Sequence, residues 1–161
     1  MRYFFDLEFT GLQLISIGVV SEDNRELYCE SCEVDWSKAE NWILENVRPK
    51  LSGNGITLSE IREKLREFVG DDTNPEFWAY NGAYDWVIMT QQLFGRLLDI
   101  PNNWPKRHKE IKELKEAVGN PPLPQRRDDE HLSITDARWN KSVFEFLGDI
   151  LEMLLWHEHV S

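Results

Sequence analysis

The feature that most constrains the fold is an apolar, β-branched run near the N-terminus. Residues 14–20 read Leu-Ile-Ser-Ile-Gly-Val-Val, which is typical of a strand covered on both faces. Residues 2–10 are rich in aromatic side chains and predict a strand directly before it. Residues 27–34 alternate in polarity, and Asp23-Asn24 supplies a turn before them. The short links between these segments predict an antiparallel meander of three strands.

Helical periodicity dominates the remainder of the chain. Thr57 followed by Glu60 is the signature of a capped helix N-terminus. Residues 102–125 carry prolines at both ends and a charged middle, which indicates a surface excursion with a helical centre. The whole order predicts a layered α/β domain with a mixed sheet flanked by helices. Helices are expected at residues 36–47, 57–69, 84–97 and in a last helix through 143–155, with a fourth strand at residues 76–80.

The size and composition fit one globular domain, expected to span residues 1–161. Apolar residues make up 41% and charged residues 29%, which argues against a disordered, collagen-like or coiled-coil chain. No apolar run approaches the roughly 18 residues that span a bilayer, and the first residues lack the apolar stretch of a secretory leader. Two cysteines are too few for a disulfide scaffold. We therefore expect a cytoplasmic protein that does not associate with membranes.

The formal net charge of −11 argues against nonspecific coating of nucleic acid, which needs a basic surface. An acidic chain can still act on nucleic acid when some of its carboxylates bind divalent cations, because the cations invert the local charge. The arrangement of particular carboxylates therefore matters more than the total charge.

Asp6 and Glu8 are the first such carboxylates. Residues i and i+2 of a strand point to the same face, so the two side chains lie side by side. Their flanks are apolar, and buried like charges cost several kcal/mol unless a cation compensates them. This pair favours a divalent-metal site with oxygen ligands, and an edge strand with exposed acids is the alternative.

Three later residues extend the pattern. Asp85 follows an Asn81-Gly82 turn signal and falls in the first turn of an expected helix, where an acid can simply stabilise the helix dipole. Asp136 lies early in the last helix, five residues after His131. A helix cap and a surface histidine would explain these two residues. The functional alternative is a metal ligand, Asp136, beside a general base, His131, because histidine titrates near neutral pH.

In chain order the residues form the pattern Asp-x-Glu, Asp, His-x4-Asp, and with it the sequence resembles the DEDDh 3′→5′ exonucleases of the ribonuclease H-like superfamily. Within them it is similar to the small exoribonuclease branch of RNase T and the polyadenylate-preferring RNase AS. The resemblance implies a ribonuclease H-like fold over nearly the whole chain. The matching segments are Phe-Asp-Leu-Glu-Phe-Thr-Gly at residues 5–11, Ala-Tyr-Asn-Gly-Ala-Tyr-Asp at 79–85 and His-Leu-Ser-Ile-Thr-Asp-Ala at 131–137.

The resemblance also implies a role for each of the five residues. Asp6 would bridge two Mg²⁺ ions, with Mn²⁺ as a substitute. Glu8 and Asp136 would complete one metal site, and Asp85 would support the other. His131 would deprotonate the attacking water. Two ions about 3.5–4 Å apart can stabilise both the attacking and the leaving oxygen of a phosphoryl displacement.

Substrate contacts are implied in the same way. Phe9 and Leu12 directly follow the Asp-x-Glu pair, where the terminal nucleotide binds in the relatives, and Phe9 would stack on a base. Both side chains could instead belong to the core. Asn81 would reach the sugar or the base. The link that follows Glu8, residues 9–13, is short here, so the base preference stays open.

The resemblance thus implies a metal-dependent 3′→5′ exoribonuclease that releases nucleoside 5′-monophosphates from single-stranded RNA ends or 3′ overhangs. It also implies a homodimer, as expected from the closer relatives. A single-stranded DNA exonuclease and a non-catalytic nucleic-acid-binding module with the same fold are the alternatives. Local basic runs would contact phosphates near the site or form solvated surface. These runs are residues 106–109, residues 126–127, and Arg138 with Lys141.

Overall fold

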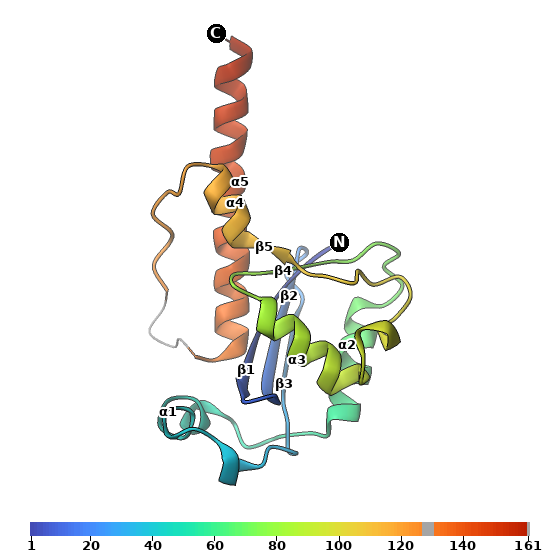
Figure 1. Cartoon of the computed structure of the whole chain (residues 1–161). Coiled ribbons are helices and arrows are strands. Elements are labelled where there is room, and N and C mark those ends of the chain that lie inside the picture. Colours follow the sequence, from blue (N-terminus) through green and yellow to red (C-terminus); the bar gives the residue numbers. More distant parts are fainter. Residues whose placement is uncertain (127–130, 161) are drawn as a thin grey trace.

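The computed structural model describes residues 1–126 and 131–160, with side chains as far as Trp156 in the last helix. Its centre is a five-stranded mixed sheet in the order β3-β2-β1-β4-β5 (Figure 1). The first three strands form the expected antiparallel meander, and β4 and β5 continue the sheet parallel to β1. The predicted α/β class is confirmed. The strands are β1 (Arg2–Thr10), β2 (Gln13–Ser21), β3 (Glu26–Glu30), β4 (Glu76–Ala79) and β5 (Lys109–Glu110).

Helices cover both faces of the sheet because β1 directs successive side chains to opposite sides. Phe5 and Leu7 join the core beneath α2 and α3, whereas Phe4 joins the core beneath α4 and α5. The capping box of Thr57 and Glu60 is present at the start of α2, as predicted. The main helices are α2 (Leu58–Val69), α3 (Ala83–Phe94), α4 (Ile111–Ala117) and α5 (Ser133–Val160).

The helix predicted for residues 36–47 is broken into pieces. A 3-10 turn, η1 (Trp36–Lys38), is followed by extended backbone at Ala39 and Glu40, then by α1 (Asn41–Asn46) and a second turn, η2 (Arg48–Lys50). The break lets side chains of both pieces pack on Ile15 of β2. Tertiary packing against the sheet therefore overrides local helix propensity here.

Residues 102–125 are more than a surface excursion. They contribute β5 to the sheet, and Trp104 and Ile111 are 4% and 0% exposed.

Two predicted boundaries are also wrong. The third strand ends at Glu30, whose carboxylate binds the backbone N–H groups of Ser52 and Gly53, so the chain turns away before residue 34. Helix α3 ends at Phe94, before a left-handed glycine.

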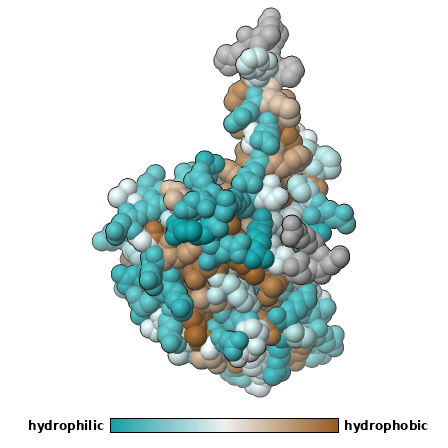
Figure 2. All heavy atoms as spheres, turned by 180° about the vertical axis from the view of Figure 1, so that it is seen from behind, coloured by the Kyte–Doolittle hydropathy of each residue, from teal (hydrophilic) through white to brown (hydrophobic). Residues whose placement is uncertain are grey.

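The last helix leaves the body of the protein. Its first half packs on β1 and β2, whereas its second half projects beyond the sheet (Figure 1). Large apolar side chains are exposed along this projection, and brown surface follows it in Figure 2. Within the described residues, none of the helices meets the length and apolarity that crossing a membrane requires. The exposed side chains are Leu151, Met153, Leu154, Leu155 and Trp156.

Candidate active site

The site begins on β1, where Asp6 and Glu8 point to the face that α5 covers. Leu7, between them, points into the opposite core. Glu8 is only 9% exposed and Asp6 is half-buried, so the pair is not an exposed acidic edge. The predicted arrangement of two carboxylates on one strand face is therefore present, and it is largely shielded from water.

Gly18 of β2 allows α5 to reach these carboxylates. It pairs with Asp6 across the strands, and a Cβ at Gly18 would lie 2.3 Å from the carbonyl oxygen of Ser133. The Ser133 hydroxyl lies 3.0 Å from that of Ser16, and the Asn140 amide donates to a main-chain carbonyl of β1 at 2.8 Å. These contacts seat the first turns of α5 directly on the sheet.

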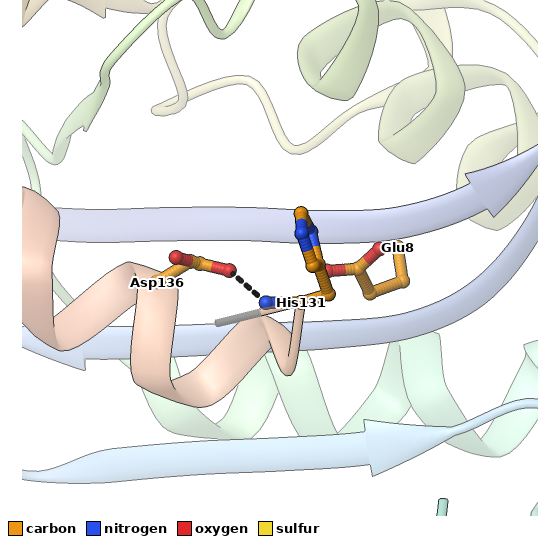
Figure 3. A group of neighbouring side chains, drawn as sticks. All are labelled: Glu8, His131 and Asp136. Atoms are coloured by element: carbon orange, nitrogen blue, oxygen red, sulfur yellow. Dashed lines mark hydrogen bonds between the residues drawn. The ribbon is translucent and has the colours of Figure 1, made fainter. Parts of the chain in front are cut away.

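This close approach assembles Glu8, His131 and Asp136. One ligand atom from each lies within 4.8 Å of the others (Figure 3). The backbone N–H of His131 donates to Oδ2 of Asp136 at 3.0 Å, which holds the residue in a left-handed conformation with φ of 67°. Arg126 donates to the other oxygen, Oδ1 of Asp136, at 3.2 Å. The cluster joins residues far apart in the sequence.

Asp85 approaches from the first turn of α3. Its Oδ1 accepts a hydrogen bond from the backbone N–H of Leu7 at 2.9 Å. Strand β4 pairs with β1 only as far as Phe4, so the next stretch of β1 has an open edge that Asp85 can occupy. The same bond places this carboxylate beside the strand that carries Asp6 and Glu8.

Glu110 of β5 holds the turn that leads to Asp85. Its two carboxylate oxygens accept the backbone N–H groups of Asn81 at 2.7 Å and Gly82 at 3.1 Å. Asn81 is left-handed, with φ of 58°, so this turn needs external support. His108 lies 3.5 Å from Glu110 and also packs edge-on against Phe5.

The electrostatics of the site favour a cation. Burial first, and then the charges of neighbouring carboxylates, raise the pKa of Asp6 well above its usual range. Burial and the charges of Asp136 and Asp85 raise the pKa of Glu8 to about 7. Burial also raises the pKa of Asp85, against the hydrogen bond from Leu7. Buried carboxylates that repel one another in this way fit the oxygen-rich ligand set of a divalent cation.

The predicted substrate residues lie in different surroundings. Phe9 follows a bulge in β1 and packs, partly buried, against the core beneath α2 and α3. Leu12 is 58% exposed at the turn between β1 and β2, so it is not a core residue. The Asn81 side chain is exposed, and its backbone N–H is bound by Glu110.

Trp42 and Lys50 were not predicted from the sequence to lie near the site, whereas Arg126 belongs to a basic run that was predicted to contact phosphates there. Trp42 of α1 meets the His131 ring at 4.8 Å between centroids, and the charge of Lys50 acts on Glu8. The Arg126 guanidinium lies 4.2 Å from the centroid of the Trp139 ring. In the sequence, the only signal for Trp42 and Lys50 would be a tryptophan followed by basic residues, and such a signal is weak.

Three other residues of the predicted basic runs have structural partners. Arg138 pairs with Glu26 at 2.6 Å, and the buried Lys141 donates to the carbonyl of Glu22 at 3.1 Å. Lys109 is paired with Glu76. Arg127 lies outside the described residues. The charges of Arg126 and Lys50 act on the carboxylate cluster.

Fold and site together define an α/β protein with a buried centre of carboxylates and a histidine, an arrangement typical of enzyme active sites. The family described as "3'-5' exoribonuclease Rv2179c-like domain" matches residues 1–147. The chain belongs to this Rv2179c-like 3′→5′ exoribonuclease family, which confirms the exoribonuclease family predicted from the sequence. The distal part of α5 lies beyond the matched residues.

Two relatives from Mycobacterium tuberculosis are 40% identical to the chain over 148 residues. They are "3'-5' exoribonuclease Rv2179c" of strain ATCC 25618 / H37Rv and "3'-5' exoribonuclease MT2234.1" of strain CDC 1551 / Oshkosh. Each alignment covers 86% of this chain and 88% of the relative. The residues matched by the family, 1–147, include the sheet, the carboxylate cluster and the start of α5.

Proposed function

We propose that this protein is a metal-dependent 3′→5′ exoribonuclease of the DEDDh type, with ribonuclease H-like layering. The observation that carries the proposal is the meeting of Glu8, His131 and Asp136 within 4.8 Å on a strand face shared with Asp6. The family names the reaction, and the site contains the residue types that the reaction needs. Both relatives carry the words "3'-5' exoribonuclease" in their names.

Divalent cations, Mg²⁺ or Mn²⁺, would be held by the four carboxylates. Asp6 would contribute to both of two sites, Glu8 and Asp136 to one, and Asp85 to the other. When bound, such ions stabilise the negative charge that develops on the attacking and leaving oxygens of a phosphoryl displacement. The crowding of carboxylates that raises their pKa values without a cation supports this assignment.

His131 would act as the general base. Its ring lies beside Glu8 and Asp136, and a hydrogen bond from its backbone to Asp136 keeps it there. A ring nitrogen of His131 accepts the proton of the attacking water, and the water oxygen forms a bond to the phosphorus of the last phosphodiester. The bond to the 3′ oxygen of the shortened chain breaks, that oxygen takes the electron pair and a proton from solvent to become the new 3′ hydroxyl, and a nucleoside 5′-monophosphate is released.

The substrate we propose is single-stranded RNA or a 3′ overhang. The net charge of −11 argues that RNA is bound along a local path at the site and not over a broad surface. A homodimer is the proposed assembly, and light scattering of the purified protein tests it. Base preference is left to experiment.

The test is a time course on 5′-labelled RNA with a single-stranded 3′ overhang, run beside a matched DNA strand. Mg²⁺-dependent shortening from the 3′ end, stopped by chelator, is the expected result. Asp6→Asn removes the central carboxylate charge while keeping its shape, so turnover should be lost with the melting temperature preserved. Normal turnover by Asp6→Asn would refute the assignment. Faster loss of the DNA strand would make the protein a DNA exonuclease.

A further inference from the structure

Helix α1 is fixed to the end of β1, next to the carboxylate cluster. The residue before the helix, Glu40, accepts a hydrogen bond from the Thr10 hydroxyl at the end of β1, 2.5 Å away. Ile43 of the helix and Val47, the residue directly after it, pack on Ile15 of the sheet. This short helix is therefore a firm support for any side chain that it directs toward the site.

Trp42 is the side chain that α1 leaves outside this packing. It is 49% exposed although tryptophan is usually largely buried. Its ring nevertheless stands perpendicular to the His131 ring, at 88° and 4.8 Å between centroids. Packing of the helix does not require the indole, so its position beside His131 needs another explanation.

The position of Trp42 suits the base of a bound nucleotide. In the proposed reaction the scissile phosphate lies at the carboxylate cluster, and one ribose separates that phosphate from the base of the terminal nucleotide. The indole contacts the ring of His131, which is itself one of the three residues of the cluster. Lys50, which follows α1 in η2, brings a positive charge toward Glu8.

We propose that Trp42 is a substrate-contacting residue whose indole stacks on the base of the 3′-terminal nucleotide. Stacking on an aromatic ring tolerates any base and is worth enough to set affinity. The inference rests on the proposed function. It gives the stacking role to Trp42, because Phe9 is packed against the core beneath α2 and α3.

The first test measures RNA affinity without turnover, by fluorescence anisotropy of labelled single-stranded RNA in the Asp6→Asn background with Mg²⁺. Trp42→Ala should raise the dissociation constant about 5- to 150-fold, the range expected for one lost stacking contact. Trp42→Phe should keep most of the affinity. The matched control is Trp156→Ala, which removes a 70% exposed tryptophan from the distal part of α5 and should leave affinity unchanged.

The second test removes the nucleobase from the RNA and leaves the indole of Trp42 unchanged. RNA with an abasic 3′-terminal ribose should bind the Trp42 protein more weakly than intact RNA, and the loss should vanish in Trp42→Ala. Such a cycle isolates the coupling between the two groups. Equal losses in both proteins would overturn the proposal. So would a Trp42→Ala variant with unchanged affinity and lowered kcat, because that result would make Trp42 a positioning residue for His131.

Failure of the two proposals can be told apart. If the protein with native Asp6 and Trp42 neither binds nor shortens RNA, the proposed exoribonuclease function fails and the stacking role fails with it. If it shortens RNA normally while every Trp42 variant binds RNA as well as the native residue does, only the stacking role is overturned. Melting curves of each variant establish that the compared proteins are folded.

Discussion

The floor of the active site and its rim are built by different means. The floor consists of Asp6, Glu8 and Asp85, which lie on a central strand or are hydrogen-bonded to it. The rim consists of His131 and Trp42, which come from the residues just before α5 and from a short helix. Floor residues are set by the sheet, whereas rim residues depend on contacts between segments distant in sequence. A substitution at the rim can therefore change these side chains while leaving the sheet, and with it the floor, in place.

The largest effect that would sharpen this comparison is a loss of kcat, and we expect it from a substitution of His131 in the rim. His131→Asn keeps a residue type that tolerates the left-handed backbone but removes the imidazole proposed as the general base. We expect kcat to fall roughly 10²- to 10⁴-fold, the usual worth of general-base catalysis, with RNA affinity nearly unchanged. Single-turnover kinetics at saturating enzyme provide the measurement. Turnover close to that of the native enzyme would show that the base lies elsewhere.

The next effect is on the stability of the folded protein without metal, and it comes from Glu8 in the floor. Glu8 has a pKa of about 7 in the folded protein against 4.5 as its ordinary value, so the folded state binds its proton more tightly. The contribution of Glu8 to the free energy of unfolding is therefore fully present below pH about 4.5, and it is lost as the pH rises through about 7. The difference corresponds to roughly 3 kcal/mol.

Urea denaturation in chelator at pH 5 and pH 8 measures this effect. The native protein should lose more stability between these pH values than Glu8→Gln, which cannot ionise, and the variant should be the more stable of the two at pH 8. Glu45→Gln, an exposed change on α1, serves as the control. Parallel pH profiles for the native protein and Glu8→Gln would contradict the electrostatic account of the floor.

A smaller effect is expected from the support beneath the floor. Glu110 accepts hydrogen bonds from the two backbone N–H groups of the turn before Asp85. Glu110→Gln replaces one acceptor with a donor, so the turn loosens. We expect Mn²⁺ affinity, measured by calorimetry, to weaken about 10- to 100-fold, as for other groups that orient metal ligands. Glu113→Gln on the exposed face of α4 should have no effect, and equal affinities for both variants would remove Glu110 from the site.

Much of the fold follows from the sequence because its strands are strongly patterned. The bounds of β1 agree with the predicted strand, and the capping box of Thr57 begins α2 where expected. The strand β5 was missed because its two residues carry no periodicity. The region around α1 was predicted as one helix because its packing on Ile15 depends on a partner that local sequence does not show.

In the site, too, residues placed by local pattern could be predicted, whereas residues placed by tertiary contacts could not. Asp6 and Glu8 could be predicted to share a face because strand alternation alone brings them together. The hydrogen bond from Leu7 to Asp85 needs the open edge left where β4 stops pairing, which depends on strand register. Trp42 lies near the cluster through a contact between distant segments, so local sequence reasoning had no means to find it. Arg126 belongs to a predicted basic run, but its hydrogen bond to Asp136 could not be read from that run.

Gly18 carries none of the chemistry, yet it decides whether the chemistry can be assembled. Any side chain there would collide with backbone at the start of α5 and push Asp136 away from the strand that bears Asp6. An inventory of acids and histidine is therefore an incomplete diagnostic for activity in related sequences. A chain that keeps all five of those residues but carries a larger residue at this position would have the residue types of the site without their arrangement, and we expect it to be inactive.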